Sequence, residues 1–116
     1  MNVLIAIGSC HQPAAHLQWA RGRLKALLGD VRFSRVLWTP DIKGSGRWYL
    51  NQLAVGDTML PADLLQEQLK TAEAETGRSA VRITLDLDLM QYGSVRYHLR
   101  DWPRPYIQRL LPDVGY

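Results

Sequence analysis

Two stretches with helical spacing, each lying between strand-like stretches, constrain the fold of this chain more than any other feature. The first strand is expected at residues 3–7, which are apolar, partly β-branched and followed by Gly8-Ser9. A helix is expected next, because Pro13 suits a first helical turn and Gly29 suits a helix end. The apolar face of this helix is Leu17, Ala20, Leu24 and Leu27 or Leu28.

Three further strands and a second helix are expected after the first helix. The strands are predicted at residues 31–39, 48–59 and 82–90, with a loop at 41–46. The helix is predicted between Pro61 and Gly77, and its apolar face is Leu64, Leu65, Leu69 and Ala72. The order β-α-β-β-α-β is typical of an α+β, ferredoxin-like two-layer sandwich. We therefore expect an antiparallel or mixed sheet with the helices on one face, then a tail from Gly93 with room for one short helix or strand.

Length and cysteine content limit the class of protein. The 116 residues are the size of one domain, so a single domain over residues 1–116 is predicted. The one cysteine, Cys10, excludes an intramolecular disulfide framework and a cysteine-based zinc finger. No apolar run reaches the ~18 residues of a membrane span, and the first residues do not resemble a signal peptide. We expect a cytoplasmic protein that does not enter a membrane.

The charge distribution indicates an anionic partner. The net charge is only +3, but six arginines and three acids lie between residues 78 and 109. A basic segment around a small acidic group is compatible with a phosphate-bearing ligand, because arginine binds phosphate oxygens in a bidentate manner.

The most distinctive local pattern is Ile-Thr-Leu-Asp-Leu-Asp-Leu at residues 83–89. Side chains alternate between the faces of a strand, so the leucines should face the core and Asp86 and Asp88 should share the other face. Acidic residues are poor strand formers, and two on one face call for a reason. Mg²⁺ supplies one, since it often binds one or two carboxylates together with substrate phosphates. On this pattern alone, a divalent-cation site and a solvated acidic face both stay open.

Other catalytic templates are absent from the sequence. Residues 44–46, Gly-Ser-Gly, lack the spacing and the lysine of a P-loop. The three histidines, His11, His16 and His98, do not have the spacing of metal ligands. Trp102 and Tyr106 lie among arginines, and stacking on a base and packing of the tail are equally compatible with their positions.

Short motifs along the whole chain resemble those of one enzyme family. They are Ala6-Ile7-Gly8-Ser9, Thr39-Pro40, Tyr49-Leu50-Asn51, Glu73 with Gly77-Arg78, Leu85-Asp86-Leu87-Asp88-Leu89, Tyr92-Gly93, and Pro103-Arg104-Pro105 with Arg109. In this order they resemble 6-hydroxymethyl-7,8-dihydropterin pyrophosphokinase, an enzyme of folate biosynthesis, over about residues 3–112. The family fold is a ferredoxin-like sandwich, which agrees with the order of elements read from the periodicity.

The resemblance implies a transferase reaction. ATP would donate its β,γ-pyrophosphate to the pterin hydroxymethyl group and leave as AMP. Asp86 and Asp88 match the family's metal ligands and would hold two Mg²⁺ ions, with Arg78 as a third catalytic residue. The positions that match the nucleotide side are Glu73, Arg78, Leu89, Arg104 and Arg109.

The resemblance also assigns a pterin side to the site. The matching positions are Gly8, Thr39, Pro40, Ile42, Tyr49 and Asn51. An asparagine amide carries both a donor and an acceptor, which suits the edge of a pterin. A tyrosine ring could stack on the flat heterocycle. The implied small-molecule partners are therefore a pterin and ATP.

The chain departs from the family pattern at several places. Cys10 stands where the family usually has asparagine, and Arg104 where it has histidine. Only seven residues separate Arg78 from Asp86, where the family has a longer mobile loop that closes over the substrates. The chain therefore resembles a short member with a truncated catalytic loop and C-terminus. A lid excludes water and positions substrates, so slower catalysis, or support from another subunit of a homo-oligomer, is compatible with this loss.

Two alternative functions follow from these departures and from the fold class. A degenerate relative would bind a nucleotide or a pterin without efficient transfer. A nucleic-acid-binding module would share the ferredoxin-like order, but the chain lacks the aromatic signature of RNA-recognition domains. Two outward-facing aspartates would also repel a nucleic-acid backbone, which disfavours this reading.

Overall fold

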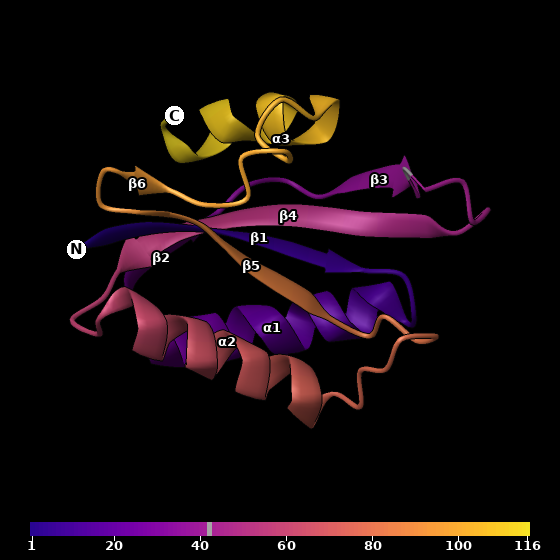
Figure 1. Ribbon diagram of the computed structural model, residues 1–116, viewed down its shortest axis with the longest axis horizontal. Helices are drawn as coiled ribbons and strands as arrows, with labels where there is room; N and C mark the ends of the chain where they lie inside the picture. The colour runs from indigo at the N-terminus through magenta and orange to yellow at the C-terminus, as the bar shows by residue number, and fades with distance from the viewer. Residues whose placement is uncertain (42) are drawn as a thin grey trace.

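The computed structural model describes residues 1–41 and 43–116, which form one sheet with helices on both of its faces (Figure 1). Along the chain the elements are β1 (Asn2–Ser9), α1 (Pro13–Leu27), β2 (Gly29–Phe33), β3 (Leu37–Pro40), β4 (Trp48–Asp57), α2 (Ala62–Glu75), β5 (Asp86–Tyr92), β6 (Val95–Arg96), α3 (Pro105–Leu110) and the 3₁₀ helix η1 (Leu111–Val114). The protein is thus α+β, as the periodicity predicts. Within the described part of the chain, no helix is both long and apolar enough to cross a membrane.

Across residues 1–41 and 43–116 the sheet is antiparallel and has six strands rather than the four expected. Its order is β2-β4-β1-β5-β6, and β3 also pairs with β4. β1 lies at the centre, with β4 on one side and β5 on the other. The residue pairs Gly8–Asn51 and Gly8–Asp86 therefore align three side-chain positions across three neighbouring strands.

The predicted strand at residues 31–39 is divided into β2 and β3. Ser34 lies between them and is buried, and its N–H donates to the carbonyl oxygen of Leu53. The hydroxyl oxygen of Ser34 accepts a hydrogen bond from the N–H of Leu53 at 2.8 Å. The ten-residue β4 pairs with β2 near one end and with β3 near the other. The interruption between β2 and β3 therefore leaves both ends of β4 paired.

α1 and α2 cover one face of the sheet, as predicted (Figure 1). Leu17, Ala20 and Leu24 are buried on α1, which confirms its predicted apolar face. On α2 the prediction for Leu64 is wrong, since this side chain is 43% exposed. Besides Leu65, Leu69 and Ala72, the residue of α2 that is buried is Glu73, an acid. Apolar periodicity cannot find a buried acid, so this position was missed.

The chain after β6 forms a second layer on the opposite face of the sheet (Figure 1). α3 and η1 pack Ile107, Leu110 and Val114 against residues of β1 and β4, and Trp102 joins this cluster. The two predicted helices thus share one face, and the short helix for which the tail had room lies on the other. Helical periodicity over six residues is too short to be recognised in a segment with two prolines.

The fourth predicted strand begins four residues later than expected, at Asp86. Ser79 and Arg82 exchange backbone hydrogen bonds of 3.0 and 3.3 Å and close a tight turn before the strand. Gly77, with φ of +81°, ends α2 in the left-handed conformation that suits a helix end. These two turns bring Arg78 beside the first residue of β5.

Candidate functional site

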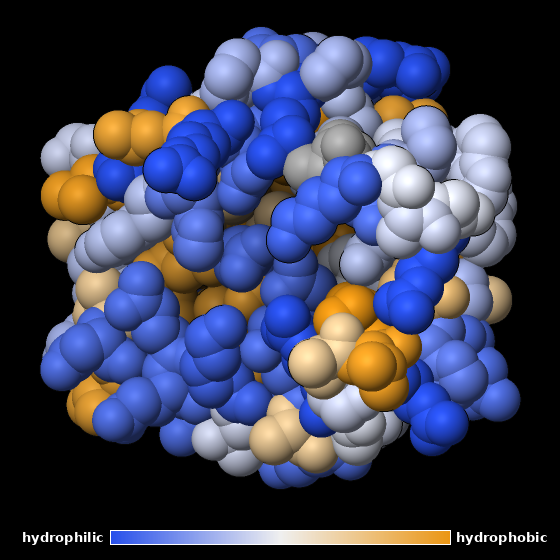
Figure 2. All heavy atoms as spheres, turned by 45° about the vertical axis from the view of Figure 1, so that its right-hand side comes forward, coloured by the Kyte–Doolittle hydropathy of each residue, from blue (hydrophilic) through white to orange (hydrophobic). Residues whose placement is uncertain are grey.

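A cavity of about 260 Å³ opens where the ends of several strands meet the loops that follow them. On this side of the molecule a hollow lies among hydrophilic side chains, with some apolar surface visible inside it (Figure 2). The residues that line the cavity are Ala6, Ile7, Gly8, Thr39, Pro40, Asp41, Lys43, Tyr49, Asn51, Arg78, Ile83, Asp86, Asp88, Asp101, Arg104 and Tyr106. They come from β1, β3, β4, β5, α3 and the connecting segments.

Small residues on β1 leave the space that the cavity fills. Gly8 is paired with Asp86, and Ala6 with Asp88, in the antiparallel register of β1 and β5. Paired residues point to the same face of a sheet, so the two carboxylates stand beside positions that have little or no side chain. The prediction that Asp86 and Asp88 share a face is consistent with their common place in the cavity wall.

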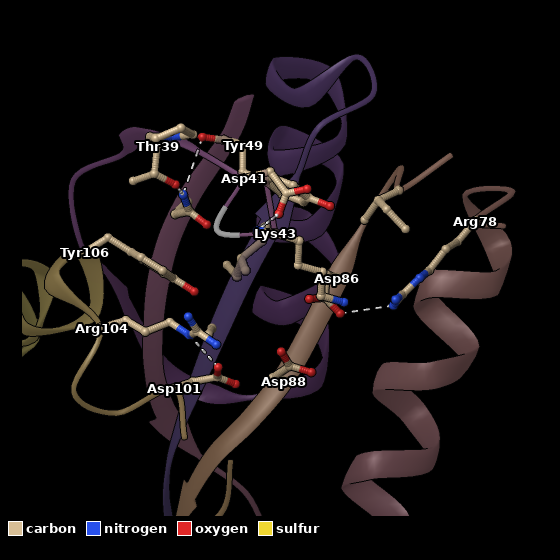
Figure 3. Close-up of a pocket in the computed structure, with 16 residues that line it drawn as sticks. Thr39, Asp41, Lys43, Tyr49, Arg78, Asp86, Asp88, Asp101, Arg104 and Tyr106 are labelled. Atoms are coloured by element: carbon tan, nitrogen blue, oxygen red, sulfur yellow. Dashed lines mark hydrogen bonds and ion pairs between the residues drawn. The ribbon is translucent and has the colours of Figure 1, made fainter. Parts of the chain in front are cut away.

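Arg78 is held between the carboxylates of Glu73 and Asp86 at one side of the cavity, and Figure 3 shows its contact with Asp86. Its Nη1 lies 2.8 Å from Glu73 Oε1 and 3.0 Å from Asp86 Oδ1. Burial lowers the pKa of the Arg78 guanidinium, but the charges of Asp86 and Glu73 outweigh it, and the pKa is raised. Glu73 also accepts a hydrogen bond of 2.7 Å from the N–H of Leu87. The buried glutamate thus connects α2, Arg78 and β5.

The environment of Asp88 disfavours its negative charge. Burial, followed by the negative charge of Asp86, raises the pKa of Asp88 to about 6. The imidazole of His98 lies nearby, at a distance of 3.8 Å between Nε2 and Asp88 Oδ1. A nearby cation would stabilise the ionised form of this half-buried carboxylate. Asp88 therefore suits the role of a metal ligand.

Replacing Asp88 with asparagine should stabilise the protein above pH 6 when no divalent cation is added. An unfolded aspartate has a pKa of about 3.9, so the pKa of about 6 in the folded state means that folding takes up a proton between these values. The stability from this group is present at low pH and is lost as the pH rises through about 6. We expect a gain of about 1–3 kcal/mol at pH 7.5 and none below about pH 4, measured by urea unfolding in the presence of a chelator.

Asp86→Asn is the matched control for this prediction. Asp86 neutralises Arg78, so its loss removes a favourable pair while it relieves repulsion with Asp88. The gain in the free energy of unfolding should therefore be smaller for Asp86→Asn than for Asp88→Asn. Equal stability of Asp88→Asn and the unchanged protein at pH 7.5 would contradict the strain assigned to Asp88.

The other wall of the cavity carries polar and aromatic groups. The side-chain N–H of Asn51 donates to Thr39 Oγ1 at 2.6 Å, which joins β4 to β3. A Cβ at Gly8 would lie 3.5 Å from Asn51 Oδ1, so this oxygen lies against the β1 backbone at the cavity floor. Burial, followed by a hydrogen bond with Cys10, raises the pKa of Tyr49 to about 12, and its phenol stays neutral near pH 7.

The structure brings most of the predicted site residues to one cavity. Those in its wall are Gly8, Thr39, Pro40, Tyr49, Asn51, Arg78, Asp86, Asp88 and Arg104. Glu73 lies behind Arg78, Ile42 lies outside the described residues, and two predicted positions lie away from the cavity. The side chain of Leu89 packs in the core under α1 and α2, and Arg109 is exposed on α3. Side-chain contact of these two residues with a ligand in the cavity is therefore not supported.

Four polar or aromatic cavity residues were not predicted as site residues: Asp41, Lys43, Asp101 and Tyr106. Asp101 and Arg104 form an ion pair of 2.7 Å and, with Tyr106, approach the aspartates from the side opposite Arg78 (Figure 3). Of the two aromatic residues that the sequence left open, Trp102 packs in the core and Tyr106 lines the cavity. The sequence feature that could have indicated these four residues is their position, because they lie within a few residues of the Thr39-Pro40 and Pro103-Arg104-Pro105 motifs.

Comparison with known proteins agrees with this arrangement. A family model described as 7,8-dihydro-6-hydroxymethylpterin-pyrophosphokinase (HPPK) matches residues 4–113. Among curated proteins, no significant match to the chain is found. The family match covers nearly all of the strands and helices that build the cavity, and the chain therefore belongs to the 7,8-dihydro-6-hydroxymethylpterin-pyrophosphokinase family.

Proposed function

We propose that the protein transfers pyrophosphate from ATP to the hydroxymethyl group of 6-hydroxymethyl-7,8-dihydropterin and releases AMP. The family consists of pyrophosphokinases of folate biosynthesis that use ATP and Mg²⁺. The observation that carries the proposal is one cavity whose wall holds a carboxylate pair between Arg78 and Arg104, and also Thr39, Tyr49 and Asn51. Such a cavity offers separate places for a charged triphosphate and for a flat heterocycle.

Asp86 and Asp88 are proposed to hold two Mg²⁺ ions, the number that the resemblance to the family implies. The fit is supported by the half-buried position of Asp88, by its raised pKa and by the second carboxylate on the same strand face. When bound, Mg²⁺ would neutralise charge on the transferred group. No separate protein base is assigned to the pterin hydroxyl.

The remaining residues are proposed to bind and orient the two substrates. Arg78, Lys43 and Arg104 supply positive charge in the cavity wall, and an arginine held by Glu73 and Asp86 is already oriented. Asn51 and Thr39 form a fixed hydrogen-bonding pair, which suits the edge of a pterin. The cavity volume of about 260 Å³ is below that of usual drug-sized pockets, so we place the pterin inside and the adenosine part outside it.

The test is incubation of the full chain with ATP, Mg²⁺ and the dihydropterin, with AMP separated from ADP. Pterin-dependent AMP is the expected product, and its formation should stop when Mg²⁺ is chelated. ADP as the nucleotide product would instead indicate transfer of a single phosphate, and would overturn the proposal.

A binding protein without efficient transfer is the second candidate, and the short segment between α2 and β5 favours it. Residues 79–82 close a tight turn, so the longer family loop has no counterpart there. In that case ATP or the pterin would bind in a saturable manner without release of AMP. Isothermal titration with each ligand, beside the AMP assay, separates the two candidates.

Replacing Gly8 with valine should weaken pterin binding while it leaves the fold intact. A Cβ at Gly8 would lie 3.5 Å from Asn51 Oδ1, 3.9 Å from Tyr49 Cδ2 and 4.0 Å from Asp86 Cβ. These are ordinary contacts, and valine favours strands, so unfolding should change little. The added methyl groups would occupy the cavity floor. We expect the KM for the pterin to rise at least about tenfold, a loss of roughly 1.4 kcal/mol in binding, with a smaller rise for Gly8→Ala.

Gly22→Ala serves as the control for the Gly8 variants. Gly22 lies on α1, and a Cβ there meets no atom within 4 Å. The KM of the Gly22→Ala protein for the pterin should equal that of the unchanged protein. An unaltered KM for Gly8→Val would place the pterin elsewhere.

We also propose that four strands and two helices form the ferredoxin-like unit. These are β2, β4, β1 and β5 with α1 and α2. The β2-β4-β1-β5 order in the sheet supports this proposal. When these four strands are numbered along the chain, they lie in the sheet in the order second, third, first and fourth, as in a sheet built from the β-α-β-β-α-β sequence. β3, β6 and α3 are then additions that frame the cavity.

A further inference from the structure

We propose that Asp88, His98 and Asp101 form a mixed nitrogen–oxygen site for a first-row transition dication such as Zn²⁺ or Co²⁺. This set differs from the carboxylate pair of the proposed Mg²⁺ site by an imidazole nitrogen. It shares Asp88 with that site, and in this respect it rests on the proposed function.

The three side chains already lie close together. One ligand atom from each residue lies within 4.8 Å of the others, and His98 Nε2 is 3.8 Å from Asp88 Oδ1. That distance is too long for a hydrogen bond. Two ligands of one Zn²⁺ at bond lengths of about 2.0–2.1 Å lie roughly 3–3.5 Å apart. A cation between the two atoms therefore requires only a small movement.

A tight turn joins His98 to Asp101. The N–H of Asp101 donates to the carbonyl oxygen of His98 at 2.8 Å, which sets the two residues side by side. The buried Trp102 anchors the turn, since its Nε1 donates to the carbonyl oxygen of Tyr97 at 3.0 Å. His98 has a φ of +51°, a conformation that costs a histidine about 1–2 kcal/mol. The turn is thus held by packing rather than by the preference of the residue.

The donor types decide which cation fits. Imidazole nitrogen suits Zn²⁺, Co²⁺, Fe²⁺ and Ni²⁺, whereas Mg²⁺ prefers oxygen ligands. Asp86 adds a further negative charge near Asp88. Arg104 opposes the cation, because its Nε lies 2.7 Å from Asp101 Oδ1. The carboxylate of Asp101 has a second oxygen with which to bind a cation. His98 is 41% exposed, so water can complete the coordination.

The test titrates the full chain with Co²⁺ alone and follows the visible absorption of the bound ion. Because even residues that only support a ligand change metal affinity about 10–100-fold, His98→Gly should weaken Co²⁺ binding at least about tenfold. Glycine accepts a positive φ without strain, so this variant should fold. Asp101→Asn should show a loss of similar size. Since neither ATP nor a pterin is present, the result does not depend on whether the chain transfers pyrophosphate.

His16→Gln is the matched control. His16, on α1, and His11, in the segment before α1, form a pair of imidazoles with ring centroids 6.3 Å apart that does not include His98. Co²⁺ affinity should be unchanged in this variant. Wild-type affinity in His98→Gly, loss of binding in His16→Gln, a thiolate charge-transfer band that disappears in Cys10→Ser, or no saturable binding at all would each overturn the proposal.

Discussion

Replacing Asp86 or Asp88 with alanine should reduce pterin-dependent AMP formation at least about 1000-fold. Both carboxylates line the same cavity wall, and each would lose its part in binding Mg²⁺. Stabilisation of transition-state charge by a metal is worth several kcal/mol, and every 1.4 kcal/mol changes the rate about tenfold. The measurement is the initial rate of AMP formation at saturating ATP and Mg²⁺, with folding verified by circular dichroism.

Asp63→Ala provides the comparison for these two variants. Asp63 is an exposed acid in the first turn of α2, away from the residues that line the cavity. Its loss changes the net charge by the same amount, and AMP formation should stay within about twofold of the unchanged protein. A folded Asp86→Ala or Asp88→Ala protein with near-normal turnover would remove the carboxylate pair from the proposed mechanism.

The elements that the sequence predicts best are those whose apolar residues follow one period over many positions. α1 spans 15 residues and begins at the expected proline, and β1 and β4 are long strands that are buried over most of their length. The break between β2 and β3 depends on hydrogen bonds between Ser34 and Leu53, which lie 19 residues apart. Such a tertiary contact leaves no periodic signal in the sequence.

Site residues on the long strands could likewise be predicted, whereas those brought in by the C-terminal segment could not. Gly8, Asn51 and Asp86 carry motif positions, and the register of β1 with its two neighbours places them in one row. Asp101 and Tyr106 reach the cavity only because the C-terminal segment folds back over the second face of the sheet. Spacing along the chain also gave no hint that His98 would meet Asp88, because the turn at residues 98–101 brings them together. Proximity that arises from a loop cannot be read from residue spacing.

Replacing Glu73 with alanine should produce the largest loss of stability among single changes around the site. The carboxylate is 5% exposed and contacts Arg78 Nη1 at 2.8 Å. It also accepts the hydrogen bond from the buried backbone N–H of Leu87 on β5, at 2.7 Å. A buried donor left without an acceptor costs about 1–3 kcal/mol, and loss of the ion pair adds to this. Because Arg78 keeps Asp86 as a partner, we expect a total of about 2–4 kcal/mol rather than the larger cost of stranding a buried charge.

Glu73→Gln separates the structural role of this residue from its role in orienting Arg78. The amide oxygen can still accept from Leu87, so urea unfolding should show a loss of about 1 kcal/mol, the net worth of a charged hydrogen bond over a neutral one. The guanidinium of Arg78 loses one of its two carboxylate partners, and the KM for ATP should rise while that for the pterin changes little. A Glu73→Ala protein as stable as the unchanged chain would show that the carboxylate does not hold α2 to β5. An unchanged KM for ATP in Glu73→Gln would show that Asp86 alone positions Arg78.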